Sequence, residues 1–296
     1  MTDAAQAPLH LDGLSQIARN YDGFVIDLWG VIHDGVTAYS GASDTLLALK
    51  RMGKRTVLLS NAPRLGRLVS DLMTTMGIDR DLYDAIMTSG DAVNLELLGR
   101  KDPFFAELGD TCYLIGPDRD VNVLEGTGVT PVRDPKQASF ALCSGPRNFS
   151  DGLDVYRSEL EACATETLPM ICSNPDMEVM RNGQRVICAG ALAAVYQQDL
   201  GQTVVFRGKP DPAIYRLAIE KLGLRTGARV AAIGDGLHTD MPGAKAAGLD
   251  GVFVTGGLNA APLGVAHGEK AEPEAIDALL ADHKATPVAT IPGFLW

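Results

Sequence analysis

Cysteine is scarce in this sequence, and its spacing forms no paired motif. The cysteines are odd in number and include no Cys-x-x-Cys pair, which argues against a disulfide framework and against a zinc site. Each stands among apolar neighbours, so we expect buried, reduced thiols and a reducing, cytoplasmic compartment. The five positions are Cys112, Cys143, Cys163, Cys172 and Cys188.

Positive charge is also in short supply. There are 26 Lys and Arg residues against 37 Asp and Glu residues, which gives a formal net charge of -11. Clustered basic residues bind nucleic acids and anionic membrane surfaces, so the composition argues against both kinds of partner. A small anionic ligand stays compatible, because a site needs only local positive charge, which a bound metal can supply.

Long apolar runs are absent, since none approaches the roughly 20 residues that a membrane-spanning helix needs. The N-terminal segment has early acidic residues and no charged-then-apolar pattern, so we expect no signal peptide. No Gly-x-Gly-x-x-Gly or Walker sequence occurs, so nothing indicates a dinucleotide or a P-loop nucleotide. With 296 residues, 46% of them hydrophobic, the chain is long enough for two domains.

Short apolar runs alternate with amphipathic stretches of helical length along the chain. The runs cover residues 23–28, 55–60, 84–89, 230–234 and 251–255. The stretches between them predict helices, each followed by a glycine that suits a C-cap, over residues 42–52, 64–76, 213–222 and 240–247. This repetition predicts an α/β fold with a parallel sheet. Further elements over 112–198 could form an insertion or extend one long sheet.

Polar residues stand at the ends of these strands or shortly after them. Groups at the carboxyl ends of parallel strands line the crevice where ligands bind. Taken singly, each has an ordinary structural explanation, because a strand-end Asp or Ser often caps a helix and Lys-Pro or Gly-Asp-Gly often forms a turn. As a set they suit phosphoryl transfer. In chain order they are Asp27, Ser60, Asn61, Lys209, Asp235 and Asp240.

The chemistry of this set centres on Asp27. Its carboxylate can attack phosphorus and form an aspartyl phosphate. A hard cation held by Asp27 and Asp235 would offset the repulsion between that carboxylate and the incoming phosphate. Ser60 can donate a hydrogen bond to a phosphoryl oxygen, and Lys209 can neutralise charge in the transition state.

The sequence resembles the haloacid dehalogenase superfamily. The resemblance lies in Asp27-x-Trp-Gly-Val, Ser60-Asn61, Gly208-Lys209-Pro210 and Gly234-Asp235 with Asp240. The segments DLWGVIHDG, LLSNAPR and SNPDMEVMRNG followed by AGALAAVYQQ are similar to the class IIA branch, which includes NagD-type, phosphoglycolate and pyridoxal phosphatases. The resemblance implies a Rossmann-like parallel-sheet core at 1–106 and 204–296, with an inserted α/β cap domain of the C2 type at 107–203.

The resemblance also implies a hydrolase of phosphoric monoesters that depends on Mg²⁺ and acts on a small phosphorylated metabolite. Asp27 would be the nucleophile and a Mg²⁺ ligand. Asp235 would bind Mg²⁺, and Asp240 would hold the outer shell of the metal. Ser60 and Asn61 would hold the transferring phosphoryl group.

Further roles follow from the same resemblance. Lys209 would stabilise the phosphate and the nucleophile. Asn174 and Asp176 would lie on the cap face towards the core and contact the substrate, for which the alternative is an ordinary Asn-Pro-Asp turn. Relatives in this branch often pair through the cap, which implies a homodimer.

The chain departs from the family pattern at Trp29, two residues after the nucleophile. Family phosphatases usually have a second Asp there, which protonates the leaving group and then activates water. Indole has one N–H group and no base function. The backbone carbonyl of Trp29 could still bind Mg²⁺, while its ring would pack against the cap or stack on a substrate.

Three accounts of the missing acid/base stay open. His33, or His238 between Asp235 and Asp240, could take its place, although loop histidines are more often simply solvated. The substrate could instead have a leaving group that needs no proton. Lastly, dephosphorylation could be slow, which would make the protein a phosphorylatable or ligand-binding switch.

Overall fold

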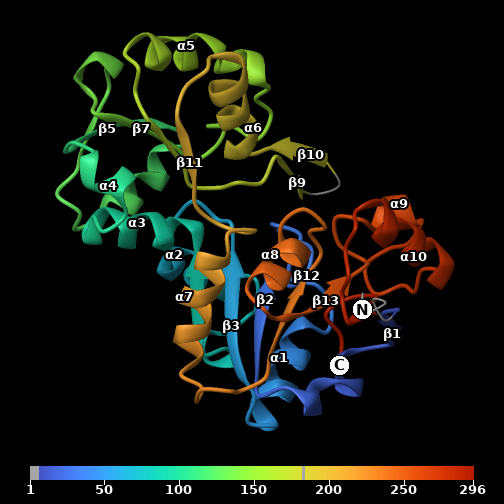
Figure 1. The fold of residues 1–296 in the computed structure, drawn as a ribbon. Coiled ribbons are helices and arrows are strands. Elements are labelled where there is room, and N and C mark those ends of the chain that lie inside the picture. The colour runs from blue at the N-terminus through green and yellow to red at the C-terminus, as the bar shows by residue number, and fades with distance from the viewer. Residues whose placement is uncertain (1–6, 182–183) are drawn as a thin grey trace, which may run out of the picture.

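Two parallel sheets, each with its own helices, make up the structure (Figure 1). The computed structural model describes residues 7–181 and 184–296. No strand of one sheet pairs with a strand of the other in these two ranges. The predicted α/β class is therefore confirmed, and the middle of the chain is an insertion with a sheet of its own.

The larger sheet has seven strands, and every adjacent pair is parallel. Their order is β1 (Leu9–His10), β14 (Ala289–Ile291), β13 (Asp250–Val254), β12 (Val230–Gly234), β2 (Gly23–Asp27), β3 (Arg55–Ser60) and β4 (Ala85–Thr88). The neighbours β12, β2 and β3 end at the same edge of the sheet. The helices of this unit are α1 (Ala42–Arg51), α2 (Gly66–Thr75), α3 (Ser89–Gly99), α7 (Pro212–Leu222), α8 (Asp240–Ala246), α9 (Ala260–Leu263) and α10 (Pro273–Asp282).

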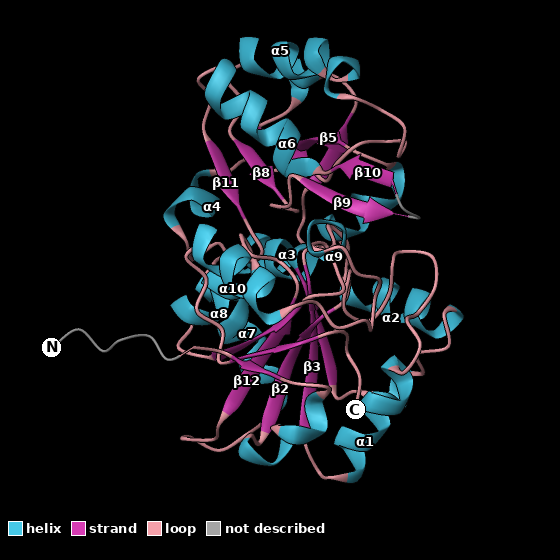
Figure 2. Ribbon diagram, turned by 90° about the vertical axis from the view of Figure 1, so that its right-hand side faces the viewer, coloured by secondary structure: helices cyan, strands magenta, loops and turns pink. Residues whose placement is uncertain are grey.

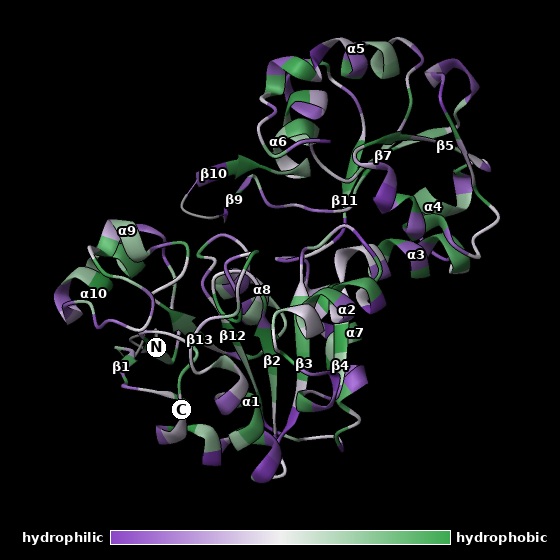
Figure 3. Cartoon of the chain, turned by 180° about the vertical axis from the view of Figure 1, so that it is seen from behind, coloured by the Kyte–Doolittle hydropathy of each residue, from purple (hydrophilic) through white to green (hydrophobic). Residues whose placement is uncertain are grey.

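Both faces of the larger sheet are buried, which explains its continuous apolar strands. Phe24 and Ile26 of β2 pack in the cluster that includes residues of α1 and α2, whereas Val25 packs with α7. Successive side chains of a strand point to opposite faces, so a strand covered on both sides is apolar at every position. Figure 3 shows these central strands mainly in the hydrophobic colour.

The second sheet has five parallel strands. Their order is β11 (Val204–Phe206), β8 (Met170–Cys172), β7 (Phe140–Cys143), β5 (Thr111–Ile115) and β6 (Thr130–Val132). Its helices are α4 (Pro103–Glu107), α5 (Arg157–Thr165) and α6 (Ala189–Ala194). An antiparallel hairpin of β9 (Glu178–Arg181) and β10 (Gln184–Ile187) lies on the side of this unit that faces the larger sheet (Figure 2).

Helix α3 packs against both sheets. Ala92 is buried with residues of the larger sheet, whereas Val93 and Leu97 are buried with residues of the second sheet. Phe105 of α4 lies in the same cluster as Val93, and β11 completes the second sheet just after the expected boundary at residue 203. We therefore propose 103–206, in place of 107–203, as the extent of the cap, with the rest of the chain as the core.

The sequence predicted the main elements of the larger sheet well. All five predicted strands and all four predicted helices are present, and the largest shift is at the start of α2, which begins at Gly66. The glycines after the helices, at positions 53, 77, 223 and 248, have the positive φ angles of left-handed C-caps. Strands of two or three residues, such as β1, β6 and β11, were missed because they are too short to show a period.

The expectations about thiols and membrane spans also have clear outcomes. All five cysteines are free and buried, as their apolar neighbours indicated. Burial raises the pKa of the Cys172 thiol to about 12, which keeps it protonated at neutral pH. Among the described residues, no helix combines the length and the apolar character needed to cross a bilayer.

Gly190, near the start of α6, allows a very close backbone contact within the cap. A Cβ atom there would lie 2.6 Å from the carbonyl oxygen of Asp176 and closer still to that of Pro175. We expect Gly190→Ala to lower the free energy of unfolding by about 1–3 kcal/mol or more, because the helix must move off this loop. Urea denaturation measures the change.

The matched control is Gly152→Ala, where an added Cβ would meet nothing within 4 Å. This variant should be neutral or slightly more stable than the wild type. Equal stability of the two variants would contradict the tight packing of α6 on residues 174–176.

Candidate active site

The polar residues predicted from strand ends meet at one edge of the larger sheet. Asp27 ends β2 and Ser60 ends β3, while Asp235 follows β12 and Asp240 begins α8. Lys209 follows β11, where the chain returns from the second sheet. All five residues line a cavity of about 170 Å³, and residues of both sheets' units contribute to its wall.

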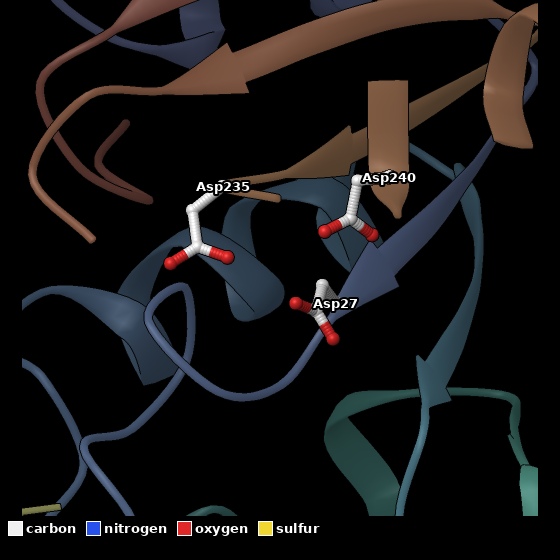
Figure 4. A group of neighbouring side chains, drawn as sticks. All are labelled: Asp27, Asp235 and Asp240. Atoms are coloured by element: carbon white, nitrogen blue, oxygen red, sulfur yellow. The ribbon is translucent and has the colours of Figure 1, made fainter. Parts of the chain in front are cut away.

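Three buried carboxylates converge in this cavity. One oxygen from each of Asp27, Asp235 and Asp240 lies within 4.8 Å of the others. Figure 4 shows the three side chains around a common space. Carboxylate oxygens are the ligands that Mg²⁺ and Ca²⁺ prefer, so this group could hold a hard divalent cation.

Lys209 is the cation that the fold itself supplies. Its side chain is buried, and Nζ lies 2.6 Å from Oδ1 of Asp27 and 2.9 Å from Oδ1 of Asp240. The same Oδ1 of Asp27 accepts a hydrogen bond from the backbone N–H of Leu28 at 2.7 Å. Oδ2 of Asp27 accepts no hydrogen bond from the described residues, so one oxygen is fixed and the other is available.

The electrostatics of the cluster leave negative charge uncompensated. Burial and the carboxylate of Asp240 raise the pKa of Asp27 well above its usual value, although Lys209 opposes the rise. Burial also raises the pKa of Asp235, with a further contribution from Asp240. For Lys209, burial alone would lower the pKa, but the carboxylates of Asp240 and Asp27 raise it well above normal. One ammonium faces three carboxylates, which favours binding of a further cation.

Glycine at position 30 brings the loop of the first motif against this cluster. Gly30 has a φ of 77°, and a Cβ atom there would overlap the carboxylate of Asp235. The backbone of Trp29 and Gly30 can therefore approach the carboxylates closely. A ligand role for the carbonyl of Trp29 requires this approach.

The ring of Trp29 packs against its own loop, and Trp29 is one of the residues that line the cavity. It meets the ring of His33 edge-on, with 5.4 Å between the centroids. A Cβ atom on Gly35 would overlap the indole, so this glycine makes room for it. Because Trp29 lines the cavity, its expected contact with a substrate stays a prediction.

Asn61 connects the core to the cap. Its Oδ1 accepts hydrogen bonds from the backbone N–H of Lys209 at 2.7 Å and from the Ser89 hydroxyl at 3.2 Å. Its Nδ2 donates to Oδ1 of Asp176 at 2.8 Å and to the carbonyl of Lys209 at 3.2 Å. Both side-chain amide hydrogens are thus used, so the side chain of Asn61 positions other groups. The expected contact of Asn61 with a phosphoryl oxygen would have to come from its backbone. Ser60 accepts from the N–H of Ala62, which leaves its hydroxyl hydrogen free to donate.

The Asn-Pro-Asp segment of the cap is both a turn and a part of the cavity. Oδ1 of Asn174 accepts a hydrogen bond from the backbone N–H of Asp176 at 3.0 Å, which is an Asx turn. Asn174 and Asp176 both line the cavity. Burial raises the pKa of Asp176, and Lys209 lowers it in part. The turn therefore presents Asp176 to the core.

The structure argues against both histidines as the substitute acid/base. Among the described residues that line the cavity, none is a histidine. His33 is 2% exposed, its Nδ1 accepts from the N–H of Gly35, and burial lowers its pKa to about 4. His238 is exposed, and its ring lies 4.8 Å from that of His283.

The sequence interpretation missed several polar residues of the cavity wall, among them Arg64, Arg119, Asp120 and Ser144. Arg64 follows Ser60 by four residues, and Ser144 stands directly after β7 of the second sheet. The rule about the carboxyl ends of parallel strands, applied to the second sheet as well as the first, would have indicated Ser144.

Two family models match this chain, and both are described as haloacid dehalogenase-like hydrolases. They match residues 24–130 and 169–248. These two segments contain the five core residues that meet in the cavity, which are Asp27, Ser60, Lys209, Asp235 and Asp240.

Solved and curated proteins show the same likeness. A crystal structure of a haloacid dehalogenase-like family hydrolase from Brucella suis 1330 is 30% identical, covers 97% of this chain and 100% of its own, and has a TM-score of 0.79. The sugar-phosphatase AraL of Bacillus subtilis is 26% identical over 237 residues, which are 79% of this chain and 83% of AraL. A glycerol phosphate phosphatase of Mycobacterium tuberculosis, solved in complex with magnesium, shares the fold at 24% identity and a TM-score of 0.64, covering 83% of this chain and 71% of its own.

His33 makes stability sensitive to acid. Its pKa is about 4 in the folded chain against an ordinary value of 6.5, so the unfolded chain takes up the proton first. This histidine's contribution to stability is complete above pH 6.5 and is lost as the pH falls from about 6.5 to about 4. We expect His33→Asn, whose side-chain oxygen can still accept from Gly35, to remove up to about 3 kcal/mol of that pH dependence.

Urea denaturation between pH 7 and pH 4 measures this effect. The control is His238→Asn, a change at an exposed histidine. If the wild type and His33→Asn lose stability in parallel over this range, His33 is not a buried neutral side chain.

Proposed function

This chain belongs to the haloacid dehalogenase-like hydrolases, and we propose that it is a Mg²⁺-dependent phosphatase that forms an aspartyl phosphate on Asp27. Its substrate in this proposal is a small phosphorylated metabolite. The observation that carries the proposal is the geometry of Asp27, a buried carboxylate fixed through Oδ1 alone beside one ammonium and two further carboxylates. The names of AraL and of the Mycobacterium tuberculosis relative, both phosphatases, support it.

In the first step, Oδ2 of Asp27 attacks the phosphorus atom. The new bond joins Oδ2 to phosphorus, and the ester bond to the leaving oxygen breaks. Lys209 stays on Oδ1 and keeps the carboxylate oriented, while the Ser60 hydroxyl donates to a phosphoryl oxygen. A water molecule then attacks the phosphorus of the aspartyl phosphate, which releases inorganic phosphate and restores the carboxylate.

The ligand set of the proposed metal site fits a hard cation. Asp27 and Asp235 would hold Mg²⁺ together with the carbonyl of Trp29, and Asp240 would hold its outer shell. When bound, the cation neutralises the cluster and polarises a phosphoryl oxygen. The Mycobacterium tuberculosis relative has been solved in complex with magnesium and with calcium, which supports a divalent cation at this site.

The leaving oxygen also needs a proton. Trp29 cannot give it, and no histidine is among the described residues that line the cavity. Besides the three clustered carboxylates, Asp120, Asp176 and Glu178 line the cavity. Asp176 is bound to Asn61, the neighbour of Ser60, and burial raises its pKa, which favours the protonated form. We assign to Asp176 the transfer of a proton to the leaving oxygen. In the second step the resulting carboxylate takes up a proton from the attacking water as the bond between Oδ2 of Asp27 and phosphorus breaks, which restores both side chains.

Trp29 keeps a second candidate function in view. Without a carboxyl group at the family position, the aspartyl phosphate could be long-lived, and the protein would then act as a phosphorylatable switch. Measurement of phosphate release together with the mass of the protein separates the switch from turnover.

Phosphate release is the direct test of the proposed function. We expect release from p-nitrophenyl phosphate and from alkyl phosphates in Mg²⁺, loss of release in a chelator, and a fall of about 10³-fold or more in Asp27→Asn. Equal release by Asp27→Asn would rule out the aspartyl phosphate. A wild type that gains the mass of one phosphoryl group without steady release, while Asp27→Asn does not, would favour the switch.

The role of Asp176 predicts a dependence on the leaving group. We expect Asp176→Asn to lower kcat for alkyl phosphates by about 10²–10⁴-fold and for p-nitrophenyl phosphate by much less, because nitrophenolate leaves without a proton. Steady-state rates over esters with different leaving groups measure this. A parallel fall for all esters would mean that Asp176 only positions Asn61 and the substrate.

Trp29→Asp tests the role of Asp176 by supplying a carboxyl group at the position where the family has one. A carboxyl group at the family position should raise the alkyl phosphate rate of Asp176→Asn. No gain in this double variant would indicate that another step limits the rate.

A further inference from the structure

The cavity has polar groups that the proposed chemistry does not use. Arg64 comes from the loop after β3 of the core, Asp120 from the 3₁₀ segment Asp118–Leu124 after β5, and Ser144 from the end of β7. The first belongs to the core and the other two to the cap. Their side chains therefore meet only where the two units face each other.

These three side chains carry buried atoms without hydrogen-bond partners. Over the ranges that the structure describes, four buried side-chain nitrogen or oxygen atoms lack a partner, and three of them are Nε of Arg64, Oδ1 of Asp120 and Oγ of Ser144. The great majority of buried polar atoms in proteins are hydrogen-bonded. Three such unpaired atoms in the wall of one cavity indicate a ligand that forms hydrogen bonds with them.

The three groups lie close enough to act on one another. Burial lowers the pKa of Arg64, and the carboxylate of Asp120 raises it in part. Burial raises the pKa of Asp120, while Arg64, Arg119 and Ser144 lower it. Nε of Arg119 and Oδ1 of Asp120 form an ion pair at 3.5 Å, and this oxygen accepts no hydrogen bond from the described residues. The cluster is thus of mixed charge and pre-assembled.

The backbone around this cluster is tightly fixed. The carbonyl of Arg64 accepts a hydrogen bond from the Thr88 hydroxyl at 2.7 Å, and a Cβ atom on Gly90 would lie 2.5 Å from the backbone of Arg64. A Cβ atom on Gly116 would overlap Oγ of Ser144. Gly90 makes room for the backbone of Arg64 and Gly116 makes room for the side chain of Ser144, so the arrangement is built into the fold.

The pattern of donors and acceptors selects the chemistry of the ligand. A carboxylate would satisfy Arg64 but would face the carboxylate of Asp120. An ammonium would satisfy Asp120 but would face the guanidinium of Arg64. A hydroxyl group accepts from a guanidinium and donates to a carboxylate in the same position, and a second hydroxyl can pair with Ser144.

We propose that Arg64, Asp120 and Ser144 form a subsite for neighbouring hydroxyl groups on the leaving group of the substrate. The substrate is then a phosphate ester of a polyol or sugar. This inference rests on the proposed phosphatase function for its reaction but not for its binding contacts.

The test compares two esters with the same carbon chain. Glycerol 3-phosphate has two hydroxyl groups that propyl phosphate lacks. We expect the wild type to favour glycerol 3-phosphate in kcat/KM, and we expect Ser144→Ala and Asp120→Asn each to lower the ratio of the two values by about 10-fold. The exposed Asp118→Asn, in the same 3₁₀ segment, is the matched control and should keep the wild-type ratio.

Asp120→Asn also changes the charge of the subsite. The remaining arginines should then accept a carboxylate, so phosphoglycolate should gain relative to glycerol 3-phosphate. A loss of packing alone would not produce this gain. Ser144→Ala keeps the charge, so it should show the lower hydroxyl preference without the gain for phosphoglycolate.

Binding to the Asp27→Asn protein in Mg²⁺ separates this proposal from the phosphatase function. If calorimetry gives tighter binding of glycerol 3-phosphate than of propyl phosphate, and Ser144→Ala removes the difference, the subsite stands even when no ester is turned over. If the wild type turns over both esters equally and binds them equally, water completes the three atoms and the proposed subsite is wrong.

Discussion

The ammonium of Lys209 between the carboxylates of Asp27 and Asp240 is the interaction on which the site depends. A buried charge without a partner is strongly unfavourable, and removing one member of such a group is costly. Asp27 ends a central strand, Asp240 begins a helix, and Lys209 arrives from the second sheet. The three elements are far apart in sequence, so the ion pairs form only when the core is folded and the chain has returned to it from the cap.

Much of the core could be predicted because the sequence signals for its strands and helices are local. Apolar runs predicted the strands, glycines after the helices predicted their ends, and the carboxyl-end rule predicted that Asp27, Ser60 and Asp235 would meet. What failed depends on three-dimensional contacts. The side-chain amide of Asn61 is fully used by Asp176 and Lys209, which are distant in sequence, and the almost complete burial of His33 likewise shows only in the folded chain.

The two units contribute different kinds of residue to one cavity. The core provides the carboxylate cluster, Lys209 and Ser60, all at the ends of the larger sheet's strands or close to its helices. The cap provides Asp176, Asp120 and Ser144 from the second sheet. Asn61 joins the two sets, since its amide binds the backbone of Lys209 on one side and Asp176 on the other. The departure at Trp29 therefore falls in the core, while carboxyl groups that could compensate for it come from the cap.

Helix α3 has a consequence for any attempt to dissect the molecule. Val93 and Leu97 are fully or almost fully buried, yet their apolar neighbours belong to the second sheet rather than to the first. Burial of a side chain of this size is worth about 1.5–3 kcal/mol. Excision of the cap would expose both side chains as an aggregation-prone apolar stripe on an otherwise intact core. A single-unit fragment would therefore need polar replacements on α3 before it could be handled as an independent, monodisperse protein.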